Sequence, residues 1–185
     1  MSNIDIYTTC PEFDTEHFHL RLVRESDAED LLECYSDPAA QKFFNSDNCT
    51  SDFFYSTTEE MRECVQSWIS EYKKRHFIRF ATIDKITGKA VGTVEMFGVK
   101  NWDNGIDGGC LRIDVKSEFE KTNFLFELIA LANDNFFALF GAELIAVKAI
   151  PEATERIAAL KSNGYAPYEL SNPNFTHFYA KTFHN

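Results

Sequence analysis

Residues 111–125 read Leu-Arg-Ile-Asp-Val-Lys-Ser-Glu-Phe-Glu-Lys-Thr-Asn-Phe-Leu and join an alternating segment to a long apolar one. Leu111 to Val115 alternate between apolar and charged side chains, which is typical of a strand with one buried face. From about Asn123 to Phe140 the chain is mostly apolar, which predicts a long helix packed in a core. The unbroken apolar run from Leu144 to Val147 predicts a strand covered on both faces. Strand, helix and buried strand in that order predict a sheet covered by helices.

The rest of the chain predicts further strands and helices of the same kind. Ser56 and Glu59 have the spacing of a capping box before an amphipathic helix that extends to Tyr72. Strands are expected at residues 18–22, 77–84, 91–97 and 175–183, further helices at residues 28–35 and from Pro151 to about 162, a loop at 45–55 and a turn at 107–109. The sequence therefore predicts one α/β (α+β) domain over residues 1–185, with a mixed central sheet of six to seven strands and helices on both faces.

Charge and cysteine content narrow the classes of function and compartment. The 185 residues include 18 basic and 29 acidic side chains, for a net charge of -11, which disfavours nucleic acid as a partner. Five cysteines at irregular spacing predict reduced thiols rather than a disulfide framework. Residues 1–5 show no signal peptide, and polar side chains interrupt the helix at 123–140, which predicts a buried helix rather than a membrane span. We therefore expect a cytoplasmic protein that binds neither nucleic acid nor membrane.

Four short motifs resemble a known family, in the same order along the chain. They are Thr-Glu-His-Phe-His-Leu-Arg-Leu at 15–22, Ser-Asp-Pro at 36–38, the hairpin from Phe80 through Gly88 to Thr93, and Asn-Gly-Tyr at 163–165. Together they resemble the ribosomal-protein alanine acetyltransferase branch of the GNAT family of acyl-CoA-dependent N-acetyltransferases. The similarity runs from about Phe13 to Phe183. It implies the GNAT fold and the transfer of an acetyl group from acetyl-CoA to a primary amine of a small molecule or a protein N-terminus.

The resemblance also implies where the cofactor would bind. In GNAT enzymes, acetyl-CoA lies between two parallel strands that splay apart, here 111–115 and 144–149. Its pyrophosphate rests on backbone N–H groups at the start of the following helix, where the helix dipole favours an anion. The implied cofactor contacts come from the backbone of Asp114 and Val115 and from the loop residues Glu120, Lys121, Thr122, Asn123, Phe124 and Leu125.

Several of these positions depart from the pattern that the family usually shows. Glu120 stands where Arg or Gln is usual. Asn123 stands where glycine is usual, and Leu125 stands where glycine or alanine is usual. Arg156 falls at the usual Ser of the branch, and Leu160 falls where many members carry a Tyr that protonates the leaving thiolate.

Two hypotheses follow from these departures. In an acetyltransferase, the cleft is open and the N–H groups of residues 120–125 point into it. In a non-catalytic binding module of the same fold that has lost acetyl-CoA, Leu125, Phe124 or Asn123 fills the cleft. Neither hypothesis specifies the acceptor amine or the oligomeric state.

Candidate catalytic and metal-binding side chains are few. Glu95 lies in the middle of a predicted strand and is the candidate general base, although a solvent-facing position on a half-exposed strand is the alternative. Cys110 is either a nucleophile or a buried, unreactive thiol. His17 and His19 share one face of a strand, but the sequence supplies no third ligand, so we expect no metal site. Phenylalanines at 43, 44, 53 and 54 either line an acceptor groove or anchor a long loop.

Overall fold

The computed structural model of the protein describes residues 5–47, 49 and 51–183. Residues 1–4, on which the expectation of a missing signal peptide mainly rests, lie outside the described residues, as do positions 48 and 50 of the predicted loop.

The described strands form two five-stranded sheets that meet at the centre of the molecule. The first sheet has the strand order β1-β2-β3-β4-β7 and is antiparallel throughout, whereas the second has the order β5-β6-β8-β10-β9 and contains the parallel pair β6 and β8. The strands are β1 (Phe13–Asp14), β2 (Phe18–Leu22), β3 (Ile78–Asp84), β4 (Ala90–Met96), β5 (Val99–Asp103), β6 (Ile106–Cys110), β7 (Arg112–Val115), β8 (Leu144–Lys148), β9 (Ala166–Tyr168) and β10 (Phe178–Thr182).

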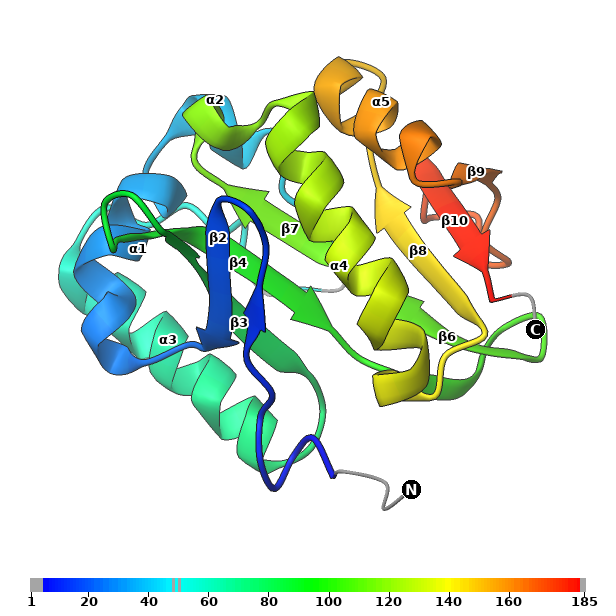
Figure 1. Ribbon diagram of the computed structural model, residues 1–185, viewed down its shortest axis with the longest axis horizontal. Coiled ribbons are helices and arrows are strands. Elements are labelled where there is room, and N and C mark those ends of the chain that lie inside the picture. Colours follow the sequence, from blue (N-terminus) through cyan, green and yellow to red (C-terminus); the bar gives the residue numbers. More distant parts are fainter. Residues whose placement is uncertain (1–4, 48, 50, 184–185) are drawn as a thin grey trace.

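Helices cover both faces of these sheets (Figure 1). On one face, α4 packs its buried residues, among them Leu125, Ile129 and Phe136, against the apolar side chains of the first sheet and of β8. On the other face, α1 and α3 enclose a second core around Tyr35 and Trp68. The helices are η1 (Glu25–Asp27), α1 (Ala28–Tyr35), α2 (Pro38–Gln41), α3 (Thr58–Lys73), η2 (Ser117–Phe119), α4 (Thr122–Phe140) and α5 (Thr154–Ser162).

The predicted α/β class, the mixed strand directions and the helices on both faces are confirmed, but several details were wrong. The structure has two sheets rather than one sheet of six to seven strands, because β7 pairs, among the described strands, only with β4 and does not pair with β8. The predicted turn at 107–109 lies inside β6, which pairs with β5 in a hairpin. The capping box before α3 is formed by Thr57 and Glu60, one residue later than predicted. Helix α5 begins at Thr154, so Pro151 lies in the turn before it.

Helix α4 is long and apolar enough to cross a membrane by length and composition alone. In this structure it is a core helix, as the sequence predicts: the side chains of Leu125, Leu128 and Ala132 are at most 1% exposed. Its C-terminus is closed by Gly141 in the left-handed conformation, with φ of 61°.

At Gly109, β6 of the second sheet comes into close contact with the residue that follows β4 of the first sheet. A Cβ atom on Gly109 would lie 1.9 Å from the carbonyl oxygen of Phe97, a backbone atom that no side-chain rotation can move. Only glycine allows this approach.

We expect Gly109→Ala to lower the free energy of unfolding by about 2–3 kcal/mol, the upper part of the range for overpacked sites. Urea unfolding measures the change. Lys100→Ala on the exposed neighbouring strand β5 is the control, and its effect should stay within about 0.5 kcal/mol. A loss below about 1 kcal/mol for Gly109→Ala contradicts the close approach.

Candidate functional site

Strands β7 and β8 diverge at Leu111, and this divergence forms the candidate site. The N–H of Leu111 donates to the carbonyl of Ala146 at 2.8 Å, after which β7 pairs with β4 alone. Figure 1 shows β7 and β8 spreading apart toward the end of the sheet where α4 begins. The splayed strands inferred from the resemblance are therefore present. They leave one edge of β7 without a strand partner.

The side chain of Arg156, from the first turn of α5, bridges this gap. Its Nη2 donates to the carbonyl of Ile113 in β7 at 2.8 Å, and its Nη1 donates to the carbonyl of Phe43 at 3.1 Å. Its Nε and Nη2 also form a bidentate pair with the carboxylate of Glu120, at 2.8 and 2.7 Å. Arg156 is 1% exposed and Glu120 is 6% exposed. Burial opposes the charge of Arg156, but the carboxylate of Glu120 outweighs it, and the pKa of Arg156 is raised.

Glu155, the residue before Arg156, occupies the N-terminal end of α4. Its Oε2 accepts a hydrogen bond from the N–H of Thr122 at 2.8 Å, and the hydroxyl of Thr122 donates to the same oxygen. These bonds hold the pKa of Glu155 below its ordinary value. The N-cap residue of α4, Lys121, provides no side-chain cap of its own. A carboxylate from α5 therefore lies at the positive end of α4, which is a favourable place for an anion.

Of the two sequence-based expectations for residues 120–125, the filled cleft of the binding module is wrong, and the backbone donors expected for the acetyltransferase are engaged in part. Leu125 is buried in the core, Phe124 packs against His17, Phe18 and Phe119, and Asn123 is exposed, so none of the three fills the gap. The N–H of Thr122 donates to Glu155, whereas that of Leu125 makes the first regular helical bond, to the carbonyl of Lys121. The gap is instead occupied by Arg156, which the sequence analysis treated only as a departure from the family pattern.

On the opposite face of β7 lies a cavity of about 410 Å³ with a buried network of charges at its base. Arg79 donates from Nε to Oε2 of Glu95 at 3.0 Å, and Arg112 donates to Oε1 of the same carboxylate at 2.8 Å. Both oxygens of Glu95 thus accept from guanidinium groups. Glu95 is 1% exposed, so the solvent-facing alternative for this residue is wrong.

Asp114 belongs to the same network, because its side chain points to this face of β7. Its Oδ2 accepts from the hydroxyl of Tyr35 at 2.8 Å and from Arg79 at 3.1 Å. Burial raises its pKa, although the charge of Arg79 opposes the shift. Within the described residues, Oδ1 of Asp114 is a buried oxygen with no hydrogen-bond partner. The side chain of the next predicted site residue, Val115, is buried in the core.

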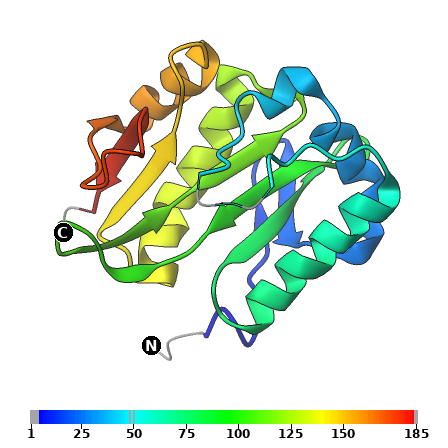
Figure 2. The same ribbon diagram turned by 180° about the vertical axis from the view of Figure 1, so that it is seen from behind.

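The segment between α2 and α3 crosses the divergence from this side (Figure 2). The amide of Asn45 donates to the sulfur of Cys110 at 3.3 Å, and Lys148 of β8 forms an ion pair with Asp47 at 2.6 Å. The predicted loop phenylalanines divide between the two alternatives: Phe53 lines the cavity, Phe44 packs on Tyr35 and Phe54 is exposed. Burial raises the pKa of Cys110 to about 11, which favours the unreactive-thiol interpretation.

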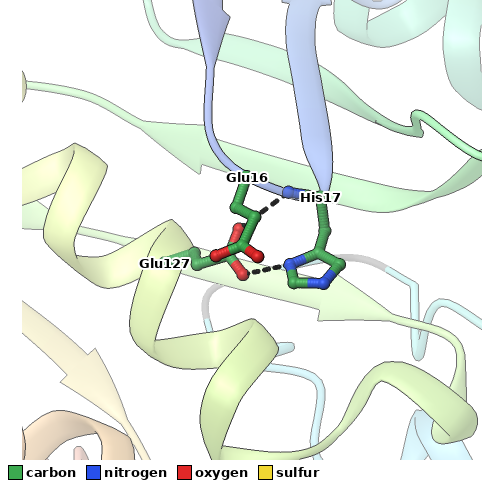
Figure 3. Close-up of side chains that lie close together, drawn as sticks. All are labelled: Glu16, His17 and Glu127. Carbon is green, nitrogen blue, oxygen red and sulfur yellow. Dashed lines mark hydrogen bonds and ion pairs between the residues drawn. The ribbon is translucent and has the colours of Figure 1, made fainter.

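Two carboxylates that were not expected from the sequence lie close to His17 (Figure 3). Glu16, His17 and Glu127 present possible ligand atoms within 4.8 Å of one another. Glu127 already accepts from the backbone N–H of His17 at 3.1 Å and contacts its Nδ1 at 2.5 Å. These bonds anchor the start of β2 to α4. His19 lies instead near Glu12 and Asp14.

A search with protein-family models matches residues 17–166 to the GNAT acetyltransferase domain. The chain belongs to the GNAT acetyltransferase family. A search of curated proteins finds no match. The GNAT fold is also shared with solved structures at low sequence identity.

These structures cover nearly the whole chain, as three examples illustrate. One, a putative ribosomal-protein-serine acetyltransferase from Vibrio cholerae, has a TM-score of 0.71 at 15% identity, covering 94% of this chain and 98% of its own. The ribosomal-protein-S5-alanine acetyltransferase from Vibrio fischeri has a TM-score of 0.69 at 16% identity, with coverage of 93% and 96%. A ribosomal L7/L12 α-N-protein acetyltransferase, solved in complex with coenzyme A, has a TM-score of 0.64 at 16% identity, with coverage of 93% and 98%.

The backbone groups that the family resemblance implies for the cofactor are present at this cleft, and two side chains are bonded to them. The exposed edge of β7 and the N-terminus of α4 are both present, as an acyl-CoA thioester requires. The carbonyl of Ile113 and the N–H of Thr122 are already engaged by Arg156 and Glu155.

We expect Arg156→Met to lower the free energy of unfolding by about 3–5 kcal/mol, because the carboxylate of Glu120 is left buried without a partner. The double variant Glu120→Gln/Arg156→Met carries no uncompensated charge and should be less destabilised than Arg156→Met alone. Urea unfolding of both variants and of Glu120→Gln completes the cycle. Losses that add without interaction contradict the pairing.

We expect Cys110 to react slowly with iodoacetamide at pH 8, because a pKa of about 11 leaves on the order of a hundredfold less thiolate than an ordinary cysteine has. Half-buried Cys49 is the internal comparison. Mass spectrometry of the digested protein follows both rates. Faster labelling of Cys110 than of Cys49 in the folded protein contradicts the assignment of an unreactive thiol.

Proposed function

We propose that the protein is an acetyl-CoA-dependent N-acetyltransferase that acts on a primary amine of a small molecule or of a protein N-terminus. The observation that carries this proposal is the pair of sites on the two sides of β7. The gap beside β8 lies at the edge of the strand, and the cavity at Glu95 and Arg112 lies on its α3 face. Membership in the GNAT family supports the same assignment.

The cofactor would be held by backbone groups rather than by specific side chains. The edge of β7 at Asp114 and Val115 would pair with its amide groups, and the backbone of residues 120–125 at the start of α4 would hold its phosphates. When bound there, acetyl-CoA supplies the acetyl group as an activated thioester.

The acceptor amine would bind in the cavity on the α3 face. Its volume of about 410 Å³ suits a small molecule or a single terminal residue rather than a folded surface. Aromatic rings of Phe53, Tyr55 and Trp68 line it and can hold a carbon skeleton. Glu71, whose carboxylate contacts Lys74 and His76, lies at its wall.

Glu95 would accept the proton that the amine loses, because its carboxylate lines the same cavity. Arg79 and Arg112 fix the orientation of that carboxylate through hydrogen bonds to both of its oxygens.

Release of free coenzyme A thiol, measured with acetyl-CoA and a panel of small amines and of peptides beginning with Ala or Ser, tests this function. With the best acceptor, we expect Glu95→Gln to lower kcat by about a hundredfold or more, as removal of a general base does. Glu71→Gln, at the wall of the same cavity, is the matched control and should change KM more than kcat. An unchanged kcat for Glu95→Gln removes Glu95 from the mechanism.

We also propose the cytoplasm as the site of action. All five cysteines are free, which suits a reducing compartment.

A further inference from the structure

Two adjacent residues of α5 each engage one hydrogen-bonding group of the cleft. Arg156 holds the exposed edge of β7, and Glu155 holds the N-terminus of α4. We propose that Glu155 and Arg156 form a latch that competes with coenzyme A for the cleft, so that the cofactor enters only when the first turn of α5 moves away. This inference rests on the proposed function.

The Arg156 half of the latch ties together four segments of the chain. Its guanidinium starts on α5 and bonds to β7 at Ile113, to the segment after α2 at Phe43, and to the residue after η2 at Glu120. A guanidinium that donates to the carbonyl of Ile113 takes the place of an amide donor from a bound ligand at the same strand edge. A ligand amide and Arg156 cannot both donate to the carbonyl of Ile113 from this edge of the strand.

The second latch residue, Glu155, opposes a bound phosphate through its negative charge. A phosphate at the start of α4 would meet the Glu155 carboxylate at the same N–H group, and like charges at this distance repel. The adjoining cavity of about 240 Å³ carries three carboxylates, Glu120, Glu152 and Glu155, against the two ammonium groups of Lys42 and Lys121. Because Arg156 balances the charge of Glu120, Glu152 and Glu155 are matched by the two lysines while Glu155 is in place, and withdrawal of Glu155 makes the lining less negative.

The start of α5 lacks one of the bonds that usually fix a helix terminus. Its N-cap, Ala153, makes no side-chain cap hydrogen bond, and Pro151 and Glu152 before it lie in an exposed turn. A helix start without a cap unwinds at lower cost than a capped one. Such a change would withdraw Glu155 and Arg156 together, since they are consecutive.

Isothermal titration with free coenzyme A tests the latch on three variants of the full chain. Glu155→Ala removes the carboxylate at α4, and we expect binding to tighten by about three- to fivefold, the effect of one charge at a helix terminus. Glu120→Gln/Arg156→Ser removes the buried bridge without leaving a lone charge, and we expect a gain of about tenfold or more. Glu152→Ala, which removes a carboxylate of the same cavity, is the matched control and should gain less than Glu155→Ala.

A second readout needs no cofactor. We expect hydrogen exchange at the Thr122 amide to accelerate in Glu155→Ala and to stay unchanged in Glu152→Ala. If the double variant does not fold, Glu155→Ala alone tests the latch, because the side chain of Glu155 is not part of the core.

The outcomes separate the latch from the proposed function. Equal binding of coenzyme A by the wild-type protein and by all variants overturns the latch and leaves the acetyltransferase proposal standing. The absence of binding by every variant at millimolar ligand overturns the acetyltransferase proposal, and with it the latch as a gate for the cofactor; the protein is then a binding module of the GNAT fold.

Discussion

The ion pair between Arg156 and Glu120 is the interaction on which the site depends. Two buried opposite charges are tolerated only when hydrogen bonds satisfy most of their donors and acceptors. Here Arg156 meets that condition by also binding two backbone carbonyls, one of them at the edge of β7. The pair therefore stabilises the splayed strands in the place where a GNAT protein would bind its cofactor. Glu155 likewise bonds to the N-terminus of α4, and it is less buried than Arg156.

A second set of buried charges lies across β7 from the first. Arg79, Glu95 and Asp114 are each at most 2% exposed, and their bonds link β3, β4 and β7 to α1 through Tyr35. Arg79 also stacks over Trp68 of α3, with 4.1 Å between its guanidinium carbon and the ring centroid. So much polarity at the centre of a sheet is costly for folding alone. It is consistent with a place at the base of the cavity in which we propose that the acceptor amine binds.

The element types were predictable because their signals are local. The apolar helix at 123–140 and the strand at 144–147 follow from periodicity, and both are present. The β5–β6 hairpin was missed because Asp107-Gly108-Gly109 has the composition of a turn. Its glycines are required instead by close contacts in the fold, with Phe97 at Gly109 and with Leu144 at Gly108. The latch was missed for a related reason. Glu120 and Arg156 are 36 positions apart, and each was interpreted alone. Their opposite charges, at two positions that both depart from the family pattern, were the available signal.

The first turn of α5 occupies the cleft of the free protein. Crystal structures of the protein without ligand and with coenzyme A test it most directly. Without ligand, the account predicts Arg156 between β7 and Glu120 and the Glu155 carboxylate on Thr122. With coenzyme A, it predicts that both side chains have left these positions and that the ligand's amide and phosphate groups replace them. A ligand-free crystal with an open cleft, and with Arg156 turned away from Ile113, would contradict the account.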